Sequence, residues 1–528
     1  MAARPFARLL LRRLAPQLSG RPSACFASAT KSARRASQLG LRIQEQLSGA
    51  AHVKDVIRIY QEYGPHFNDV NLATCWQRLA QVAGNTQRPP TAETRAVFRA
   101  LQQNTGAVLP RLRAARLRGI VQAMVKLERW GCDQRLWQAV QTAVQGFCKE
   151  MTPRNLATIA WAFAKSRKEA PELFEEIAVA SIPQLGSFQP VDLAMMAWSF
   201  STVGHHAPEL FHGIAHESTA RVNALNAQDL ANIAWAFANA HHEARALFDA
   251  IASETLVSGE IAKPRDLANM VWAFAKAKHE SPALFQAAAI TVAPKCHELK
   301  PIELSMCAWA FCRARQKAPV LFDRIAHHAS SKIDQFDPQA LSMLVWAFAA
   351  MKHPAPDLFH AVRRVCTPHL DSFASAGLAK VAWAIAQAGP PDATFFEAVA
   401  KESTLRLNEF NAQEIAMLAS AFAVSAHYSP ELLDAMAVVA ASDTSAFSTR
   451  NIASMCQSYA ALRHPAKSLF DAFGAEAELH VQNFSHNDLV QIAWSFLHVD
   501  YDRPSLFDAI TAEVMRRIEG LSAAELSR

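Results

Sequence analysis

Six histidines recur at one position of a repeated pattern, and they are the residues of this chain whose type most readily does chemistry. They lie at multiples of 37 residues, at His205, His242, His279, His353, His427 and His464. Histidine acts as a general base and as a metal ligand. Stacked helical repeats place equivalent side chains roughly 10 Å apart, because neighbouring helices pack at about 8–10 Å. One metal ion cannot bind two side chains at that distance, so we interpret these histidines as turn or helix-capping residues.

Other patterns that support catalysis or cofactor binding are missing from the sequence. It has no glycine-rich phosphate loop, no HExxH motif and no nucleophile elbow. The nine cysteines include no CxxC pair, and the spacing of Cys307 and Cys312 does not fit a zinc knuckle. We therefore predict that the protein is not an enzyme and that it has no catalytic residues, no metal site, no cofactor and no small-molecule substrate.

A tryptophan marks the repeat that must position the remaining polar residues. Seven tryptophans from Trp161 to Trp383 are each 37 residues apart. Two further steps land on Ser420 and Gln457, and the register returns at Trp494. A fixed period of this length indicates a stack of supersecondary units. Positions within a unit are counted below from this tryptophan, so that the recurrent histidine is at +7.

Each unit is predicted to form two helices, A and B. Position −9 holds a good N-cap residue in six of ten units, and position −8 is proline in five. An apolar residue at −10 completes a hydrophobic staple, so helix A is expected from −8 to about +5. Its apolar positions −5, −2 and +2 form one stripe flanked by alanine. One unit cannot bury that stripe alone. We therefore predict an all-α fold, a right-handed α-solenoid of stacked helix-turn-helix repeats.

The predicted organisation has four parts. Residues 1–44 contain nine Lys or Arg and no Asp or Glu, which is typical of a disordered organelle transit peptide; a basic tail or a nucleic-acid-binding arm is the alternative. Residues 45–150 continue the repeats in a degenerate, capping form, and residues 151–520 hold ten regular units. Residues 521–528 match the start of an incomplete eleventh unit, which suggests either a truncated chain that lacks a C-terminal domain or a frayed end.

Removal of the basic segment changes the charge balance. The chain has 53 Lys or Arg and 47 Asp or Glu, and without residues 1–44 the balance is 44 to 47, or about −3. A mature protein with this charge is not globally basic, so nucleic-acid binding must depend on local arrangement. No run of 18 apolar residues occurs, and we expect no membrane insertion.

Three positions of helix A vary between units while the framework is nearly constant. Positions −7, −3 and +4 lie within about 40° of one another on the helix, opposite the apolar stripe. They carry amide, basic, hydroxyl and thioether groups. Amide and arginine side chains on successive repeats contact base edges in one-base-per-repeat RNA-binding proteins; neutral drift of a solvated face is the alternative, favoured by methionine at four of the −3 positions. The candidate RNA-binding residues are Arg154, Thr158, Lys165, Gln228, Asn232, Asn239, Arg265, Asn269, Lys276, Arg313, Gln339, Lys380, Gln387, Gln413, Arg450, Ser454, Asn487 and Gln491.

The repeat resembles two known families. LNAQDLANIAWAFANAHHEARALF (225–248) is similar to the octotricopeptide repeat of algal organelle RNA factors. DVNLATCWQRLAQ (69–81) resembles the leucine-rich helical repeats of FAST-kinase-like mitochondrial RNA proteins. The resemblance covers residues 68–528 and implies an organelle RNA-binding protein in RNA processing, stability or translation of rRNA or mRNA. Two features depart from the pattern: the period is one residue shorter than usual, and no RAP-type C-terminal domain follows.

Two hypotheses on function stay open. In the first, the protein binds single-stranded organelle RNA along a concave face, together with other RNA-processing proteins, in the mitochondrial matrix or, alternatively, the chloroplast stroma. In the second, it is a protein-binding scaffold of the same shape, whose groove takes a peptide or helix. The near-neutral mature charge favours the scaffold, whereas the variable stripe and the resemblance favour RNA. The tryptophans then either pack between repeats or stack on bases.

Overall fold

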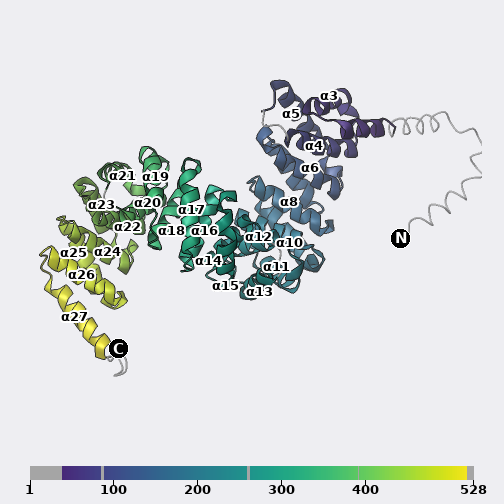
Figure 1. Ribbon diagram of the computed structural model, residues 1–528. Helices are drawn as coiled ribbons and strands as arrows, with labels where there is room; N and C mark the ends of the chain where they lie inside the picture. Colours follow the sequence, from purple (N-terminus) through teal and green to yellow (C-terminus); the bar gives the residue numbers. More distant parts are fainter. Residues whose placement is uncertain (1–37, 85–88, 258–261, 390–391, 520–528) are drawn as a thin grey trace, which may run out of the picture. The chain divides into compact units, whose positions relative to one another are not determined.

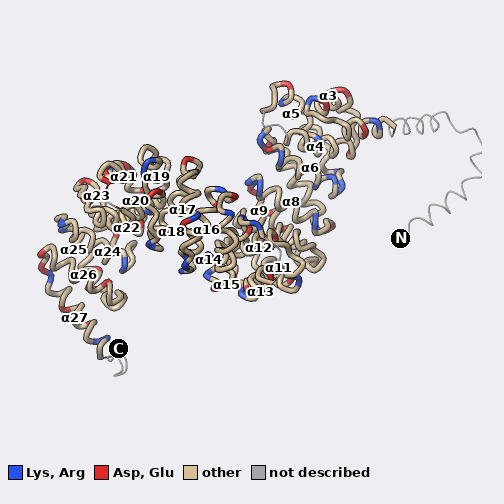
Figure 2. Tube along the Cα trace, in the orientation of Figure 1, with Lys and Arg blue, Asp and Glu red and all other residues tan. Residues whose placement is uncertain are grey.

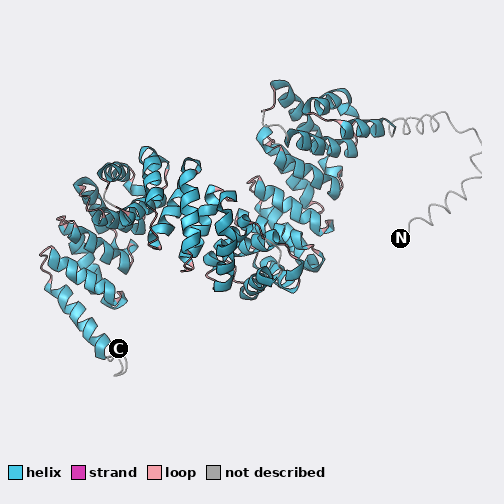
Figure 3. Ribbon diagram, viewed as in Figure 1, coloured by secondary structure: helices cyan, strands magenta, loops and turns pink. Residues whose placement is uncertain are grey.

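The structure is a computed structural model that describes residues 38–84, 89–257, 262–389 and 392–519 (Figure 1). Helices joined by short turns make up this part of the chain, and it contains no β-strand (Figure 3). The prediction of an all-α repeat fold is confirmed. The described residues form two compact units, one ending at Ile214 and the other starting at Ala215. The predicted eleventh unit and residues 1–37 of the predicted transit segment lie outside the described residues.

Residues 38–44, which the sequence pattern assigns to the disordered transit segment, belong instead to a helix over residues 38–49. Ile43 and Leu47 are fully buried in it. The side-chain amide of Asn71 also donates a hydrogen bond to the Gly40 carbonyl at 2.9 Å. Burial of an aliphatic side chain stabilises by about 1.5–3 kcal/mol, which explains why this segment is part of the folded protein despite its basic composition.

The first unit contains two layers of helices. The A layer consists of α4 (Asp69–Gly84), α6 (Ala114–Lys126), α8 (Pro153–Lys165) and α10 (Pro190–Val203). The B layer consists of α3 (Val53–Tyr63), α5 (Ala92–Val108), α7 (Gln134–Gln145) and α9 (Pro171–Ser181), and α11 (Pro208–Ala220) begins in this unit. Each A helix packs against the next A helix, and α3, α5, α7 and α9 pack in the same order. Because α8 packs on α6, the degenerate repeats continue directly into the regular ones.

The second unit repeats this arrangement (Figure 1). Its A helices are α12 (Ala227–Asn239), α14 (Pro264–Ala277), α16 (Pro301–Arg313), α18 (Pro338–Ala350), α20 (Ser375–Ala388), α22 (Ala412–Val424), α24 (Thr449–Ala461) and α26 (His486–His498). Its B helices are α13 (Arg245–Val257), α15 (Pro282–Val292), α17 (Pro319–Ser331), α19 (Pro356–Cys366), α21 (Ala393–Leu405), α23 (Pro430–Ser442), α25 (Lys467–Leu479) and α27 (Pro504–Glu519). In each of the ten regular 37-residue repeats, helix A begins at −8 and ends at +4 or +5, as the sequence predicts.

The start of helix A is set by its N-cap residue. At α22 the Asn411 side chain accepts a hydrogen bond from the Glu414 N–H at 3.0 Å, and the Glu414 carboxylate accepts one from the Asn411 N–H at 3.1 Å. This capping box satisfies N–H groups that have no partner inside the helix. Asn226, Asp337, Ser448 and Ser485 cap their helices with a side chain in the same way. Thr152 has a suitable side chain but makes no capping hydrogen bond.

The end of helix A is set by a left-handed residue at +6. In α14 this residue is Lys278, with φ 55°. The Lys278 N–H donates to the Ala275 carbonyl at 3.3 Å, and the His279 N–H donates to the Phe274 carbonyl at 3.0 Å. These two bonds are those of a Schellman motif. Gly204 occupies +6 of its unit with φ 70°, which shows that the turn is the same whether or not +6 carries a side chain.

The core lies between the A and B layers and is built from phenylalanine pairs. Phe248 of α13 meets Phe274 of α14 edge to face, with ring centroids 4.9 Å apart, and both side chains are buried. The pair recurs at Phe174–Phe200, Phe285–Phe311 and Phe470–Phe496. Each pair joins helix B of one repeat to helix A of the next repeat. The apolar stripe of helix A is therefore buried only when repeats stack.

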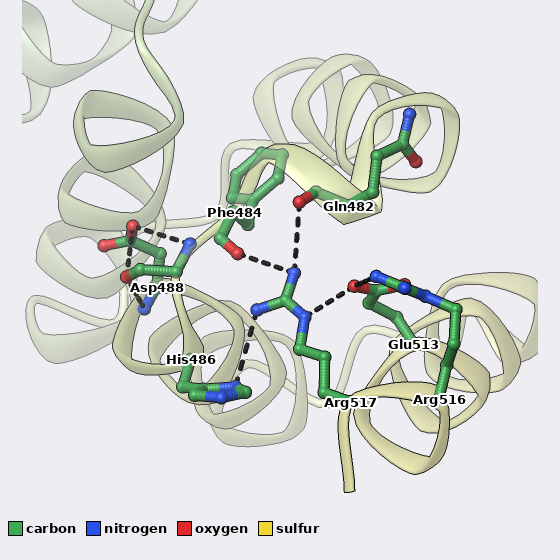
Figure 4. A network of polar contacts seen from close by, with 8 residues as sticks. Gln482, Phe484, His486, Asp488, Glu513, Arg516 and Arg517 are labelled. Atoms are coloured by element: carbon green, nitrogen blue, oxygen red, sulfur yellow. Dashed lines mark hydrogen bonds and ion pairs between the residues drawn. The ribbon is translucent and has the colours of Figure 1, made fainter. Parts of the chain in front are cut away.

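An arginine near the end of helix B donates hydrogen bonds to backbone carbonyls of the turn that precedes helix A. In the last described unit, Arg517 of α27 donates to the carbonyls of Phe484 at 2.9 Å and Gln482 at 3.1 Å (Figure 4). Glu513 holds this guanidinium through a contact of 2.5 Å and also pairs with Arg516 at 2.7 Å. Arg517 therefore joins helix B to the turn before helix A of the same repeat, whereas Arg516 pairs with Glu513 of its own helix.

Stability at acidic pH is expected to depend on Glu513. Hydrogen bonds from Arg516 and Arg517 lower the pKa of Glu513 from 4.5 to about 2. A depressed pKa in the folded state stabilises the fold at pH values above 4.5, and that contribution disappears as the pH falls toward 2. We expect Glu513→Gln to reduce the urea stability of α27 at pH 7 and to bring variant and wild type together near pH 2. The exposed Glu397→Gln is the control, and a difference for Glu513→Gln that does not change with pH would contradict the assignment.

Candidate nucleic-acid interface

Three tryptophans of the second unit form a continuous row, the indole row, defined by Trp235 of α12, Trp272 of α14 and Trp309 of α16. The rings of Trp235 and Trp272 are stacked, with centroids 6.1 Å apart and an interplanar angle of 22°. Trp272 and Trp309 are 6.2 Å apart at 39°. All three side chains are half-buried. The indoles of these three repeats therefore contact one another, and each keeps exposed surface.

The short distance between these rings follows from the small residues around them. Ala234 and Ala236 flank Trp235 on the helix and have no exposed surface. Small flanking residues let α12 and α14 approach closely, so that indoles on neighbouring helices come within reach of each other. The alanines that the sequence repeats are therefore what brings the tryptophans into one row.

A lysine lies over the middle ring of the row. The ammonium of Lys276 is 4.9 Å from the centroid of Trp272 and donates a hydrogen bond to the side-chain oxygen of Asn239 at 2.8 Å. Desolvation by burial lowers the pKa of Lys276. A cation placed over an indole face is attracted to the ring electrons. Two of the predicted site residues, Lys276 and Asn239, are thus brought together across the α12–α14 contact.

The amides at position −3 lie one helical turn before the tryptophans. Asn232 of α12 and Asn269 of α14 are half-exposed, and Gln228 and Arg265 at position −7 are exposed. Arg265 approaches the carboxylate of its neighbour Asp266 at 3.3 Å. In these two helices the predicted positions −7 and −3 therefore border the indole row on its accessible side.

In the first unit, two of the predicted site residues, Arg154 and Thr158, make contacts within the fold. Arg154 of α8 forms an ion pair with the buried carboxylate of Asp192 in α10, at 2.5 Å. Thr158 is fully buried, and its hydroxyl donates to the Arg154 carbonyl at 2.7 Å. Arg154 therefore links two repeats, and the Thr158 side chain has no exposed surface with which to contact RNA. Burial of this kind is not visible from position −3 alone, because the equivalent residues in the other regular repeats are partly buried or exposed.

The remaining predicted residues lie at the surface. Exposed side chains belong to Lys165, Arg313, Gln339, Lys380, Gln387, Gln413, Arg450 and Asn487, and half-exposed ones to Ser454 and Gln491. Lys and Arg recur along both units (Figure 2). Contact of any of these side chains with RNA stays a prediction.

The site predicted from the sequence does not include a set of basic residues at position +6. These residues have φ between 50° and 55° and are Arg167, His241, Lys278, Arg315, Lys352 and Arg463. A left-handed residue at a helix end is usually glycine, because a side chain is strained there. The signal in the sequence is Gly204 at the same register, which identifies +6 as the left-handed position. The five Lys and Arg side chains of this set place positive charge two residues beyond the +4 residues.

The recurrent histidines at +7 are turn residues, as predicted. The ring of His279 packs against Phe248 and Phe274, and its Nε2 lies 2.9 Å from the carboxylate of Asp249 in the preceding helix B. The same histidine–carboxylate contact occurs at His205–Glu175, His353–Asp323 and His464–Asp434. The histidines therefore connect neighbouring repeats. The carboxylate lies 30 residues before the histidine, in helix B of the preceding repeat. This contact was not expected from the sequence.

The remaining candidate features of the described residues are possible metal ligands, cysteine thiols and long apolar helices. No cluster of three or more His, Cys, Asp or Glu side chains there could hold a metal ion. The cysteines in those ranges are free thiols and most are buried; burial raises the pKa of Cys75 to about 12, which disfavours the reactive thiolate. No helix in the same ranges is long and apolar enough to cross a bilayer.

Comparison with known proteins places the chain in a family. Residues 92–319 and 298–528 match the family model described as RNA-editing substrate-binding complex 6 protein. The search of curated proteins found no match. Among solved structures, a homology model of the full-length AP-3 complex in an intermediate open conformation is similar at 10% identity, with 97% of each chain covered and a TM-score of 0.27, which is too low to support an inference. The narrower resemblance to octotricopeptide and FAST-kinase-like repeats stays a prediction. Since the two matched ranges span most of the sequence, the chain belongs to the RNA-editing substrate-binding complex 6 protein family.

Proposed function

We propose that this protein binds single-stranded RNA along helix A of its repeats, with the indole row as the strongest contact, and acts in organelle RNA processing. One observation carries the proposal: Trp235, Trp272 and Trp309 form a row, with Lys276 over its middle ring. Aromatic rings beside a cation are what proteins use to hold unpaired bases. On α12 and α14 the row is accompanied by polar residues at positions −7, −3 and +4.

Each part of this surface has a function in the proposal. Exposed indole surface stacks on bases, which contributes about 1–3 kcal/mol per base and tolerates any base. The half-exposed amides of Asn232 and Asn269 donate to and accept from base edges, which gives sequence preference. Lys276, together with Lys278 at +6 of the same repeat, neutralises phosphates. Local arrangement of these groups allows RNA binding although the mature chain is close to neutral.

The family membership supports RNA processing as the context. The matching family is named for a complex that binds the substrates of RNA editing. Together with the Arg-rich, acid-free residues 1–44, this supports the mitochondrial matrix as the location, ahead of the chloroplast stroma. We propose a non-catalytic role in which the protein holds RNA for other components of such a complex. A scaffold that binds only proteins is the competing function, since the family name denotes a multicomponent assembly.

Selection from a pool of single-stranded RNAs tests the proposal. We expect the full chain to retain RNA at moderate salt, with log affinity falling linearly with log salt at about −0.7 per phosphate contact. Asn232→Ser with Asn269→Ser should change the enriched sequence. Gln491→Ser, also at position −3 but on α26, is the matched control and should leave the preference at the indole row unchanged. A chain that retains no RNA at moderate salt, while it still binds other proteins, would support the scaffold instead.

A further inference from the structure

A cavity of about 350 Å³ lies where helix A turns into helix B beside the indole row. Residues from the end of α12, the start of α13 and the end of α14 line it. Three of the lining residues have cationic side chains, namely Arg245, Lys276 and Lys278. The only lining carboxylate is that of Glu243. The turn therefore encloses a hollow with an excess of positive charge.

Cavities of this kind recur in the repeats, each with its own cations. The one at the end of α8 is lined by Arg167 and Lys168. An equivalent cavity of about 240 Å³ lies at the end of α18 and is also bordered by α20. Its basic lining residues are Lys352 and His353, and the position that corresponds to Lys276 is Gln387. The hollow at the turn from helix A to helix B is therefore not confined to the α12–α14 pair. The concentration of cations beside Trp272 belongs to the sequence of that repeat pair.

Three histidines also line the cavity. His241, His242 and His279 are among the lining residues. His279 faces the carboxylate of Asp249 at 2.9 Å, so Asp249 and Glu243 are the two acidic groups beside the cavity. Arg245 begins α13, a helix of 13 residues whose N-terminal end carries partial positive charge from its unpaired N–H groups. The charges and the helix end both favour an anion.

Lys276 connects the cavity to the indole row. Its ammonium is 4.9 Å from the Trp272 ring and also lines the cavity. Because Lys276 belongs to both places, a phosphate in the cavity would lie next to a base stacked on Trp272. Phosphate oxygens are strong acceptors, which arginine and lysine bind well. The helix dipole alone would account for a cation near the end of an A helix, but it does not account for Arg245 at the start of α13.

We propose that this cavity, defined by Arg245, Lys276 and Lys278 with the three histidines, binds a phosphate group of the RNA held on the indole row. The inference rests on the proposed function and adds to it a fixed position for the RNA backbone. Lys278 is the cation that can be removed most safely, because its left-handed conformation, with φ 55°, suits glycine.

The test compares two variants of the full chain. One is the double variant Arg245→Gln with Lys278→Gly, and the other is the single variant Lys352→Gly. Lys352 also occupies +6, with φ 53°, at the equivalent cavity, so both glycine variants should fold at least as well as wild type. Anisotropy of a labelled single-stranded RNA is measured over a range of salt. We expect the slope of log affinity against log salt to become less negative by about 0.7–1.4 in the double variant, and to stay unchanged in Lys352→Gly. An unchanged slope in a double variant of normal helical content would overturn the inference while leaving RNA binding intact.

A second titration separates backbone phosphate from free phosphate. Inorganic phosphate is added to the wild type while tryptophan emission is followed, because Lys276 lies on the Trp272 ring. Emission that changes in the wild type and not in the double variant, together with the reduced salt slope, supports the proposal. A phosphate response with an unchanged RNA salt slope would mean that the cavity holds free phosphate, and it would reject the RNA contact. If the wild type binds no RNA at all, the proposed function and this inference both fail.

Discussion

Replacing Trp272 with alanine is expected to weaken binding of single-stranded RNA by about 5- to 150-fold. The estimate corresponds to about 1–3 kcal/mol for one base stacked on an aromatic ring. Trp272 is the central member of the indole row, in contact with Trp235 at 6.1 Å and with Trp309 at 6.2 Å. Its removal also leaves Lys276 without the ring over which it lies. Fluorescence anisotropy at fixed salt measures the change in Kd.

Two variants separate stacking on RNA from packing between repeats. Trp272→Phe keeps an aromatic face and is expected to lose much less affinity than Trp272→Ala. Trp346→Ala removes a half-buried tryptophan of the same register on α18, outside the indole row. Circular dichroism and thermal melting check that each variant is folded. If Trp346→Ala weakens RNA binding as much as Trp272→Ala does, the row has no special role. If neither variant changes the Kd, the tryptophans serve packing alone.

Replacing Phe274 with alanine is expected to destabilise the second unit by about 3–5 kcal/mol, the usual range for a buried phenylalanine. Phe274 has no exposed surface and packs against Phe248 and His279. The loss comes from removed apolar contacts and from a cavity between the layers. Because each repeat contacts its neighbours, the effect should be strongest near α14. Hydrogen exchange should become faster in α12, α14 and α16 and stay unchanged in α24.

Matched variants keep this prediction specific. Phe274→Leu retains most of the volume and should cost less than about 1.5 kcal/mol. Gln339→Ala changes an exposed side chain at the start of α18 and should be close to neutral. Uniformly faster exchange along the whole unit after Phe274→Ala would show that the repeats unfold together, and would contradict the nearest-neighbour view of the stack.

Much of the repeat follows from local rules. The N-cap residue at −9 and the apolar residue at −10 predict where each helix A begins, and the structure places all ten starts there. Capping acts within about four residues, so the neighbouring sequence contains the needed information. The end of the helix was predicted less completely. Position +6 is left-handed in nearly every unit, yet glycine occurs there too rarely for the turn type to stand out.

The candidate site was harder to predict because it depends on contacts between repeats. Position −3 contains both Thr158, which is fully buried, and Asn269, which is half-exposed. The pattern of one helix cannot distinguish them. In the same way, Arg154 looked available for RNA, whereas the structure pairs it with the buried carboxylate of Asp192. That residue lies 38 positions away in the sequence, and only packing of α10 on α8 brings it close.

The sequence by itself determined the period, the two helices of each unit and the residues that cap them, because these depend on spacing and on neighbours a few residues apart. The tertiary structure alone decided which side chains meet across repeats. It joined Trp235, Trp272 and Trp309 into one row, paired His279 with Asp249, and gathered Arg245, Lys276 and Lys278 around one cavity. The physical reason is that these contacts depend on how closely two helices approach, which the small alanines permit but which no single helix specifies.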